Sequence, residues 1–407
     1  MWRLGLLTVG LVLGLLAGCL SPAGPAARNP VTPTFTPPGS TSSPVPGVPP
    51  PAPTAAGPAQ PTPGSLRPGV EVVATGLQAP WSLDFAPDGR IFVTERPGRV
   101  RVIAGGRLQP EPWATVPVAE QPGSESGLMG IALDPDFRSN GFVYVYYSYQ
   151  DQGHLWNRLV RLVDRNGRGE VDRVLLDRIP GASIHDGGRV KFGPDGKLYL
   201  TVGDAAVGEN AQNPNSLNGK ILRLNPDGTV PPDNPFPGSP VYALGLRNPQ
   251  GLAWHPLTRQ LFASDHGPSG GPPNCCHDEL NLIEPGGNYG WPVVFGAGGA
   301  PRFTDPVLES GTETWAPSGI DFGTAGPVRG VLFIAALRGQ HLRAVWLGLP
   351  GFRRVEAQQV LFQNEYGRLR DVVAGPDGAL YILTSNRDGR GSPRPGDDKL
   401  LRVTFGP

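Results

Sequence analysis

The sequence is poor in cysteine and methionine, and it carries no net charge. Its 407 residues include three cysteines and two methionines, and 35 lysines and arginines are balanced by 35 aspartates and glutamates. This balance excludes the broad electrostatic field with which proteins hold nucleic acids or anionic membranes. Residues 68–407 also lack long helical periodicity, and the whole chain has 58 glycines and 49 prolines, which favour turns. The folded part is therefore expected to be all-β.

The N-terminus has the features of a bacterial export signal. Arg3 precedes a largely apolar run over residues 4–16, which is short for a membrane-spanning helix. Residues 16–19, Leu-Ala-Gly-Cys, resemble the lipobox of bacterial lipoproteins, in which cleavage leaves an acylated cysteine at the N-terminus. We expect residues 1–19 to be a lipoprotein signal ending at Cys19, with an ordinary secretory signal as the alternative. Either places the protein outside the cytoplasm, in the periplasm or on the cell surface.

Residues 20–67 have a composition that does not support a folded core. They are rich in Pro, Thr, Ala, Gly and Ser and contain almost no large apolar residue. We expect a disordered tether, which at about 3.1 Å per residue would reach roughly 140 Å. The only membrane contact would then be the lipidated Cys19, and residues 68–407 would form the folded domain.

One pattern recurs in the folded domain: an alternating apolar strand, a Pro-Asp-Gly type turn and a second strand of branched and aromatic residues. The clearest copies are residues 81–94, 188–201 and 369–384. Weaker copies are residues 127–148, 251–264 and 318–335. Six units of four antiparallel strands predict a six-bladed β-propeller, with an array of β-sandwiches as the alternative. Loops on one face of a propeller would build a binding site.

His185 and Arg247 each lie in a loop that enters a predicted blade. His185 precedes two glycines at the start of the third unit, where an accessible imidazole is suited to act as a general base. Taken alone, a single histidine is more often structural. Arg247 and Asn248 precede the fourth unit, and an arginine there is suited to polarising a carbonyl or binding a carboxylate. A salt bridge between blades explains Arg247 equally well.

Two segments around the fourth unit have the oxygen-rich character of calcium sites. Gly267 and Pro268 lie in a turn whose backbone carbonyls can face a hard cation. Asp278, Glu279 and the carbonyls around Tyr289 offer oxygens for a second site. Neither segment has the ligand spacing of an EF-hand, so only the type of ligand supports this prediction.

A group of arginines lies toward the C-terminus. Arg387, Arg390 and Arg394 occupy one short loop, and Arg338 precedes them. Several guanidinium groups in one place suit a ligand with several carboxylates. The alternative is a solvated basic loop that is partly neutralised by nearby aspartates.

Together and in this order, these segments resemble the soluble pyrroloquinoline-quinone-dependent glucose and aldose sugar dehydrogenases, over nearly all of residues 70–405. The matching segments are residues 76–81, 125–130, 185–189, 217–223, 246–251, 266–268, 278–281 and 288–292. The resemblance implies a catalytic propeller that oxidises the anomeric C1 of aldoses to lactones, by hydride transfer to bound pyrroloquinoline quinone (PQQ). Calcium would assist, and the electrons would pass to an external acceptor that the sequence does not identify.

The resemblance also implies roles for individual residues. His185 would take the proton of the anomeric hydroxyl while hydride leaves C1. Arg247, with Asn248 beside it, would contact the quinone oxygen on which negative charge accumulates. Calcium on the carbonyls of Gly267 and Pro268 would polarise the same oxygen.

Further contacts follow from the same comparison. Glu279 and the carbonyl of Tyr289 would hold a second, structural calcium. Glu125 occupies a position where the family has a polar residue beside the cofactor. The cofactor's carboxylates would be bound by Arg338 and by the loop arginines Arg387, Arg390 and Arg394.

Two features depart from the family pattern. Ile184 precedes His185 where the glucose dehydrogenase has a carboxylate, and Asp186 follows it, so contacts to the sugar are expected to differ. An insertion at residues 272–277 places Cys275 next to Cys276. In an oxidising compartment these thiols can form a disulfide between neighbouring residues, a hypothesis that alkylation of two free thiols would contradict.

Two other functions are compatible with the sequence. A calcium-dependent propeller lactonase or esterase would need no quinone, but it would also have no use for an arginine cluster. A tethered propeller that binds a glycan or a protein without catalysis would make His185 dispensable. The preferred aldose is not apparent from the sequence, and the neutral charge balance permits a monomer or a weak dimer.

Overall fold

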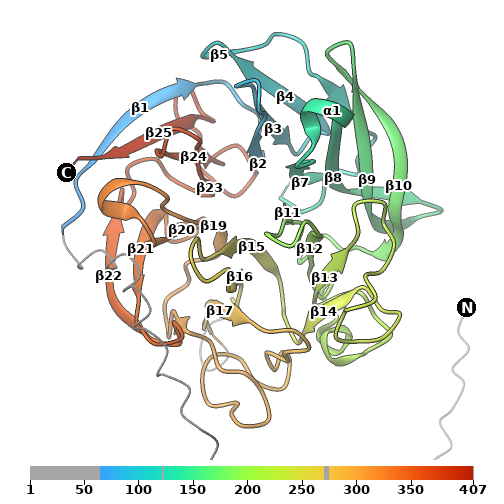
Figure 1. Ribbon diagram of the computed structural model, residues 1–407, viewed down its shortest axis with the longest axis vertical. Coiled ribbons are helices and arrows are strands. Elements are labelled where there is room, and N and C mark those ends of the chain that lie inside the picture. The colour runs from blue at the N-terminus through green and yellow to red at the C-terminus, as the bar shows by residue number, and fades with distance from the viewer. Residues whose placement is uncertain (1–64, 122, 270–274, 407) are drawn as a thin grey trace, which may run out of the picture. The chain divides into compact units, whose positions relative to one another are not determined.

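The computed structural model describes residues 65–121, 123–269 and 275–406. The predicted export signal with Cys19, and nearly all of the predicted tether 20–67, lie outside the described residues. The described chain forms six antiparallel sheets in a ring about a central axis (Figure 1). This arrangement is a six-bladed β-propeller, and it confirms the fold class expected from the sequence repeat.

The first three blades follow one another along the chain. Blade 1 contains β2 (Pro80–Phe85), β3 (Ile91–Glu95), β4 (Arg99–Ala104), β5 (Arg107–Leu108) and β6 (Ala114–Thr115). Blade 2 contains β7 (Leu128–Leu133), β8 (Phe142–Asp151), β9 (His154–Arg165) and β10 (Arg168–Pro180). Blade 3 contains β11 (Val190–Phe192), β12 (Leu198–Val202), β13 (Lys220–Leu224) and β14 (Val241–Leu244). Strands pair in chain order from the axis outward, and the short β6 pairs with β4.

The other three blades complete the ring. Blade 4 contains β15 (Pro249–Trp254), β16 (Leu261–Asp265), β17 (Glu279–Ile283) and β18 (Leu308–Glu309). Blade 5 contains β19 (Pro317–Phe322), β20 (Leu332–Ala336), β21 (His341–Leu347) and β22 (Val355–Leu361). Blade 6 contains β23 (Leu369–Ala374), β24 (Leu380–Thr384), β25 (Leu400–Phe405) and β1 (Pro68–Ala74). The six sequence copies thus correspond to the first two strands of the six blades.

Blade 6 combines the two ends of the described chain. β1 pairs antiparallel with β25, with partners running from Pro68–Phe405 to Ala74–Leu400. This pairing covers the outer edge of β25, which would otherwise expose unpaired backbone groups. The ring is therefore closed by hydrogen bonds between strands that are far apart in sequence.

Helical structure in the described residues is limited to three short segments. They are α1 (Phe137–Asn140) and the 3₁₀ turns η1 (Gly208–Gln212) and η2 (Gly326–Val328). None of the described helices has the length and apolar character needed to cross a membrane. The small helical content agrees with the lack of helical periodicity in the sequence.

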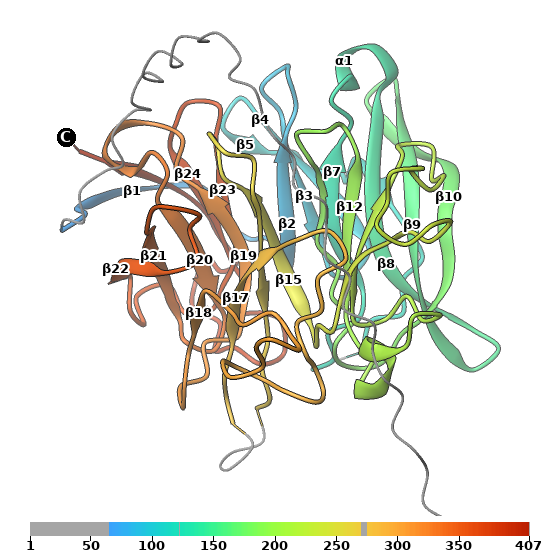
Figure 2. The ribbon, with the colours of Figure 1, turned by 60° about the horizontal axis from the view of Figure 1, so that its bottom comes forward.

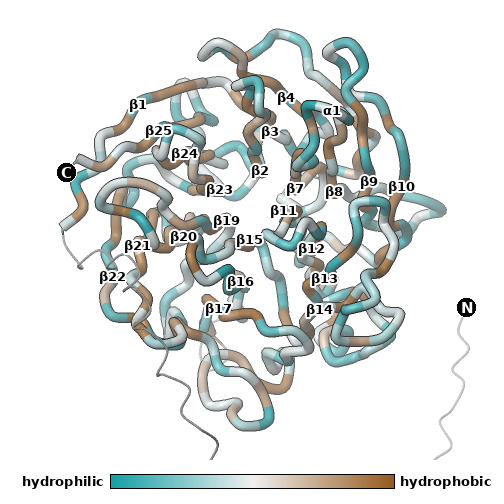
Figure 3. The backbone as a smooth tube through the Cα atoms, viewed as in Figure 1, coloured by the Kyte–Doolittle hydropathy of each residue, from teal (hydrophilic) through white to brown (hydrophobic). Residues whose placement is uncertain are grey.

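Six buried apolar clusters hold the blades together, one at each interface between neighbours. Between blades 2 and 3, for example, Tyr144 packs in the same cluster as Val190 and Leu200. The strands of adjacent blades stand side by side in the turned view (Figure 2), and apolar residues concentrate on strands while many loops are polar (Figure 3). Each fully buried large apolar side chain contributes roughly 1.5–3 kcal/mol of transfer free energy.

The buried side chain of Arg189 connects four blades. It extends from the entrance of β11 in blade 3, and its Nη1 donates to Ser82 Oγ in blade 1 and to Asp371 Oδ2 in blade 6, each at 2.8 Å. Its Nε donates to the carbonyl of Gln250 in blade 4 at 2.8 Å. The guanidinium carbon also lies 4.5 Å from the centre of the Trp81 ring. These contacts require Arg189 to lie at the centre of the ring.

Candidate active site

Loops from all six blades line a cavity of about 440 Å³ on one face of the ring. The volume is in the range of small-molecule sites. The lining residues lie at the entrance of a blade's innermost strand or just after its second strand, because these two antiparallel strand ends point to the same face. The residues are Arg96, Ser124, Glu125, Ile184, His185, Arg247, Gln250, His266, Ser269, Thr314, Ala316, Leu337, Arg338, Arg368, Arg370, Asp388 and Arg390.

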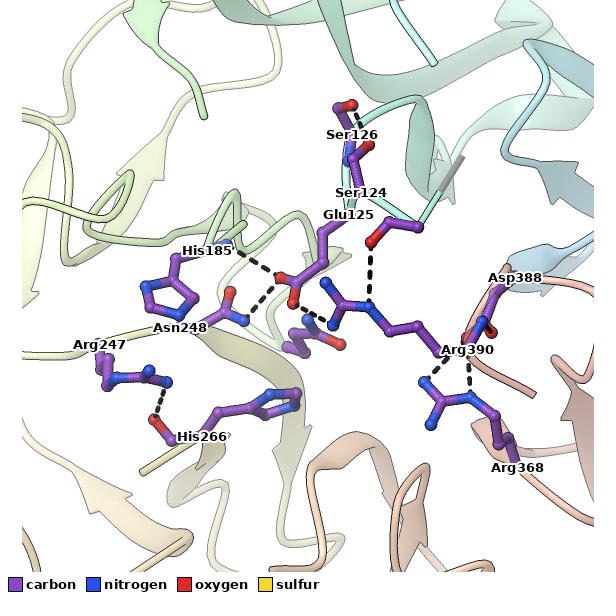
Figure 4. A network of polar contacts seen from close by, with 12 residues as sticks. Ser124, Glu125, Ser126, His185, Arg247, Asn248, His266, Arg368, Asp388 and Arg390 are labelled. Atoms are coloured by element: carbon purple, nitrogen blue, oxygen red, sulfur yellow. Dashed lines mark hydrogen bonds and ion pairs between the residues drawn. The ribbon is translucent and has the colours of Figure 1, made fainter. Parts of the chain in front are cut away.

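His185 is held by a buried carboxylate that the sequence analysis missed. Its Nδ1 lies 2.8 Å from Oδ1 of Asp204. Its backbone N–H donates to Glu125 Oε2 at 2.9 Å (Figure 4). His185 has a left-handed backbone with φ of 64°, and Gly187 follows with φ of 67°. Because Nδ1 is engaged, Nε2 is the ring nitrogen left to meet a ligand. Asp204 lies two residues after the second strand of blade 3, where the predicted blade pattern places residues near the site, so its position was a usable signal.

Glu125 and Asn248 connect the loops of several blades. Glu125 Oε2 also accepts from Asn248 Nδ2 at 2.9 Å, and Oε1 pairs with Arg390 at 2.9 Å (Figure 4). Burial acts to raise the pKa of Glu125, but the charge of Arg390 and the hydrogen bond from the His185 backbone N–H act to lower it, and its pKa lies below the usual value. Asn248 is buried, and its Oδ1 accepts from the N–H of Gly187. Glu125 is therefore an anion fixed between the loops of blades 2, 3, 4 and 6.

Arg247 enters the cavity from a loop that a second carboxylate fixes. Asp265 accepts the backbone N–H groups of Arg247 and Asn248 at 2.8 and 2.7 Å. Burial raises the pKa of Asp265 to about 7, against the effect of these hydrogen bonds. The Arg247 side chain itself has few partners: Nη1 donates to the His266 carbonyl at 3.3 Å, and Nε is buried without a partner among the described residues. Most of its hydrogen-bonding capacity is available to a ligand.

His266 contributes a second imidazole to the cavity wall. Burial lowers its pKa to about 3, and the charges of Arg247 and Arg370 act in the same direction. The ring is therefore neutral at physiological pH. Its Nε2 is buried and has no hydrogen-bond partner within the described part of the chain. The sequence did not predict a side-chain role for His266, because the calcium argument concerned only the backbone carbonyls after it.

The cavity is strongly basic. Six arginines line it, against the two carboxylates of Glu125 and Asp388. Asp388 pairs with Arg368 at 2.9 Å and with Arg370 at 3.4 Å. Burial opposes ionisation of Asp388, but these two arginines lower its pKa below the usual value. Burial also lowers the pKa of Arg370 to about 9, which leaves it cationic at neutral pH. The surplus of positive charge favours an anionic ligand.

The arginines predicted from the sequence divide into two groups. Arg338 and Arg390 line the cavity, whereas Arg387 and Arg394 are not among the lining residues. Arg387 Nε donates to the Asp397 carbonyl at 2.7 Å, and Arg394 donates to the carbonyls of residues 364 and 365. The lining arginines that the sequence did not predict are Arg96, Arg368 and Arg370. The last of these lies inside a repeat copy, where the pattern indicates only a strand residue.

The first predicted calcium segment lies between two cavity residues. Gly267 and Pro268 separate His266 from Ser269, both of which line the cavity. The Gly267 N–H donates to Asp278 Oδ1 at 3.0 Å, and a Cβ at Gly267 would come within 1.8 Å of the Cys276 carbonyl oxygen. Only glycine fits there. Among the described residues no three His, Cys, Asp or Glu side chains converge, so a cation at this place would depend on backbone carbonyls.

The second predicted calcium segment is buried in blade 4. Glu279 Oε2 accepts from Asn281 Nδ2 at 2.9 Å, and Oε1 accepts from the Gly296 N–H at 2.7 Å. Burial and the neighbouring Asp265 raise the pKa of Glu279 to about 8. Tyr289 is also buried, and its hydroxyl donates to the Leu282 carbonyl at 2.8 Å. Both calcium sites stay predictions.

The residues that depart from the family pattern have clear positions. Ile184 lines the cavity, whereas Asp186 is buried and accepts from Asn157 Nδ2 at 2.8 Å. The cavity therefore presents an apolar side chain beside His185. Cys275 and Cys276 are joined by a disulfide, and Thr314 from the cavity wall donates to Cys276 Sγ at 3.0 Å.

Residues 77–402 match the family described as Glucose / Sorbosone dehydrogenase. The chain belongs to this family. It is 33% identical to the aldose sugar dehydrogenase YliI of Escherichia coli over 351 residues, which cover 79% of this chain and 91% of the relative. The resemblance inferred from the sequence motifs is thereby confirmed, and the family supports an oxidoreductase that acts on sugars.

Two solved structures have the same fold as this chain. A Thermus thermophilus protein described as a putative oxidoreductase (glucose dehydrogenase) is 48% identical, with a TM-score of 0.76 over 84% of this chain and 100% of that chain. The aldose sugar dehydrogenase of Streptomyces coelicolor, solved in its PQQ-bound form, is 38% identical, with a TM-score of 0.73 over 84% of this chain and 99% of that chain.

Proposed function

We propose that the protein oxidises the anomeric C1 of aldose sugars to lactones, with PQQ bound in the arginine-lined cavity. The observation that carries the proposal is the excess of six arginines over two carboxylates in a cavity that also holds an imidazole fixed by a carboxylate. A neutral sugar or ester needs no such surplus of charge, whereas PQQ is a planar tricarboxylic acid. The PQQ-bound form of the Streptomyces relative supports the same cofactor.

The donor atoms of the cavity fit a polyanionic ligand. Arg247 Nε, Arg370 Nε and His266 Nε2 are buried without partners among the described residues, although buried polar atoms normally have hydrogen bonds. Arg338, exposed at the rim, makes no side-chain hydrogen bond or ion pair within the same residues. We infer that Arg338, Arg368, Arg370 and Arg390 hold the carboxylates of the cofactor.

His185 acts as the general base in this proposal. Its Nε2 takes the proton of the anomeric hydroxyl, while Asp204 keeps Nδ1 in place and stabilises the imidazolium that forms. The hydrogen on C1 leaves with its two electrons, so the sugar becomes a lactone. Bound PQQ would accept the hydrogen and its two electrons as hydride, and an external electron acceptor would reoxidise the cofactor. Arg247 would stabilise the negative charge that accumulates on the quinone oxygen.

Calcium is part of the proposal on chemical grounds. A cation on the carbonyls of Gly267 and Pro268 would supply Lewis-acid assistance next to Arg247. A second cation on Glu279 and the carbonyl of Tyr289 would have a structural role, and the buried carboxylate of Glu279 supports it. Oxygen donors of this kind suit calcium better than a transition metal.

We also propose that the protein is exported and held at the membrane by a lipid on Cys19. The support is the lipobox and the tether composition of residues 16–67. In cells that express Cys19→Ala, the protein should move from the membrane fraction to the soluble extracytoplasmic fraction. Equal membrane retention of both forms would contradict the lipid anchor.

The decisive experiment adds PQQ and calcium to the purified apo-protein and follows dye reduction with a panel of aldoses. His185→Ala should bind PQQ but lose at least about 100-fold in rate, as expected when a general base is removed. His154→Ala, an exposed histidine on β9, is the matched control and should retain full activity. If the wild-type protein does not bind PQQ, the proposal fails, and hydrolysis of lactones by the same preparation would indicate the calcium-dependent lactonase instead.

A further inference from the structure

The indole of Trp291 contacts Arg247 and the carboxylate that holds His185, without lining the cavity. Its Nε1 donates to Oδ2 of Asp204 at 2.8 Å, while Oδ1 of the same carboxylate lies 2.8 Å from His185 Nδ1. Its ring centre lies 5.3 Å from the guanidinium carbon of Arg247. One side chain in the loop after β17 therefore contacts the partner of the base and the cation.

The hydrogen bond from Trp291 fixes the plane of the Asp204 carboxylate. Oδ1 accepts from the Ala206 N–H at 2.8 Å as well as facing His185. Trp291 Nε1 is the one hydrogen-bond donor to Oδ2 within the described residues. Without it the carboxylate would be held through Oδ1 alone, and the imidazole would be oriented less firmly.

The contact between the Trp291 indole and Arg247 is as important, because the Arg247 side chain makes few other contacts. Its Nη1 makes a long hydrogen bond of 3.3 Å to the His266 carbonyl, and its Nε has no partner in the described part of the chain. A guanidinium within about 6 Å of an indole centre is attracted to the ring. The indole therefore limits the positions that the Arg247 head can take.

Trp291 is itself held by several segments. Its backbone N–H donates to the Gly245 carbonyl at 3.0 Å, and its backbone carbonyl accepts from Gln212 Nε2 at 2.7 Å. The side chains of Gln212 and Asn288 exchange two hydrogen bonds, at 3.0 and 2.9 Å. The next residue, Pro292, packs against Gly208, where an added Cβ would lie 3.0 Å from the proline Cβ. The indole thus sits on a rigid support built from blades 3 and 4.

We propose that Trp291 is a positioning residue that sets the orientation of the His185–Asp204 pair and of the Arg247 guanidinium together. The expected effect on the reaction rate rests on the proposed function. The effect of Trp291 on the orientation of these side chains does not depend on which reaction the site performs. Because Trp291 is not a lining residue, its loss should lower kcat while KM for the sugar changes little.

The kinetic test uses Trp291→Phe, which removes the N–H but keeps a ring beside Arg247. In the enzyme reconstituted with PQQ and calcium, we expect kcat to fall about 10-fold and KM to stay within about 2-fold. Losses of this size are typical when a residue that only orients a catalytic side chain is replaced. The double variant with Asp204→Asn should be no slower than Asp204→Asn alone, because both changes remove the same contact. Trp156→Phe, whose indole N–H has no partner among the described residues, is the control and should behave as wild type.

A second measurement needs neither cofactor nor sugar. In apo-protein with ¹⁵N-labelled histidine, the ring resonances of His185 are identified by their loss in His185→Ala. They should shift or broaden in Trp291→Phe and stay unchanged in Trp156→Phe. If Trp291→Phe does not fold, Trp291→His, which replaces the indole by a smaller ring, takes its place in both measurements and should change them in the same direction.

The outcomes are separable. Unchanged His185 resonances overturn the inference, as do multiplicative effects of Trp291→Phe and Asp204→Asn. A raised KM with normal kcat also overturns it, since Trp291 would then contact the sugar directly. Absence of aldose oxidation by the wild-type protein would overturn the proposed function, while the resonance measurement would still decide the role of Trp291.

Discussion

Nη1 of Arg189 lies 2.8 Å from Oδ2 of Asp371, and each side chain is about 1% exposed. Arg189→Met would leave the Asp371 carboxylate buried without its charged partner, which typically costs about 3–5 kcal/mol. We therefore expect the free energy of unfolding to fall by this amount, measured by urea denaturation of the apo-protein.

The control for that variant is Arg402→Met. Arg402 pairs with Asp377 and Glu71 at the surface, with its own side chain 31% exposed. Exposed pairs contribute less than about 1 kcal/mol, so its unfolding midpoint should hardly move. Equal effects of the two substitutions would contradict a special role for the central arginine.

The arginines that line the cavity should differ from those that do not in their effect on PQQ affinity. Arg338→Met removes a guanidinium that makes no side-chain hydrogen bond within the described residues, so the fold should be unaffected. Losing one hydrogen bond to a charged group costs about 1.5–3 kcal/mol, which is a roughly 10–100-fold rise in Kd. Arg394→Met should leave Kd unchanged, and calorimetric titration of the apo-protein with PQQ measures both. A larger loss of PQQ affinity in Arg394→Met than in Arg338→Met would instead support the sequence-based prediction that Arg394 binds the cofactor.

Asp186 should make stability depend on pH. Burial raises its pKa from 3.8 to about 7, Glu125 acts in the same direction, and hydrogen bonds from Asn157 and Ala182 oppose the shift. Because the folded state binds the proton more tightly than the unfolded state, this contribution is complete below pH 3.8 and is lost as the pH rises to about 7.

Asp186→Asn should remove this dependence. At about pH 4 the variant and the wild type should have similar stability, whereas at about pH 8 the variant should be more stable by more than about 1 kcal/mol, because it buries no charge. Urea denaturation at several pH values gives the comparison. A difference that stays constant over this range would show that Asp186 does not titrate within it.

Calcium at Glu279 should be visible as stability in the absence of PQQ. Treatment with a chelator should lower Tm, and added calcium should restore it, since a ligand at about 100 times its Kd stabilises the folded state by about 2.7 kcal/mol. Glu279→Gln should abolish the calcium effect, whereas Glu111→Gln, at an exposed position in blade 1, should not. A wild-type protein whose Tm ignores the chelator would contradict this site.

The fold could be predicted because its signals are local. Turns such as residues 194–196 join the first two strands of a blade, and the alternation on either side shows which faces are buried. The pairing of β1 with β25 has no such signal, because nothing near Pro68 indicates a partner at the other end of the folded region. The length of β10, thirteen residues, was also not apparent, since this outer strand of blade 2 is largely exposed and has little apolar alternation.

The site was predictable only where a residue follows or precedes a strand in a conspicuous loop. His185, Arg247 and Glu125 satisfy that condition, and all three line the cavity. Arg370 does not, because its side chain reaches the cavity from within β23. A cluster of arginines in sequence also says nothing about which side chains turn inward, and Arg394 instead donates to the backbone carbonyls of residues 364 and 365.

Because Pro68 pairs with Phe405, the two ends of the propeller lie side by side, and the fold does not require that the chain start in blade 6. The two residues are cross-strand partners, so a short linker would join them and make the polypeptide a closed loop. New termini could then be opened at an exposed turn such as residues 195–196, which lies between strands of one sheet. Several circular permutations of this sequence should therefore specify the same ring and the same cavity.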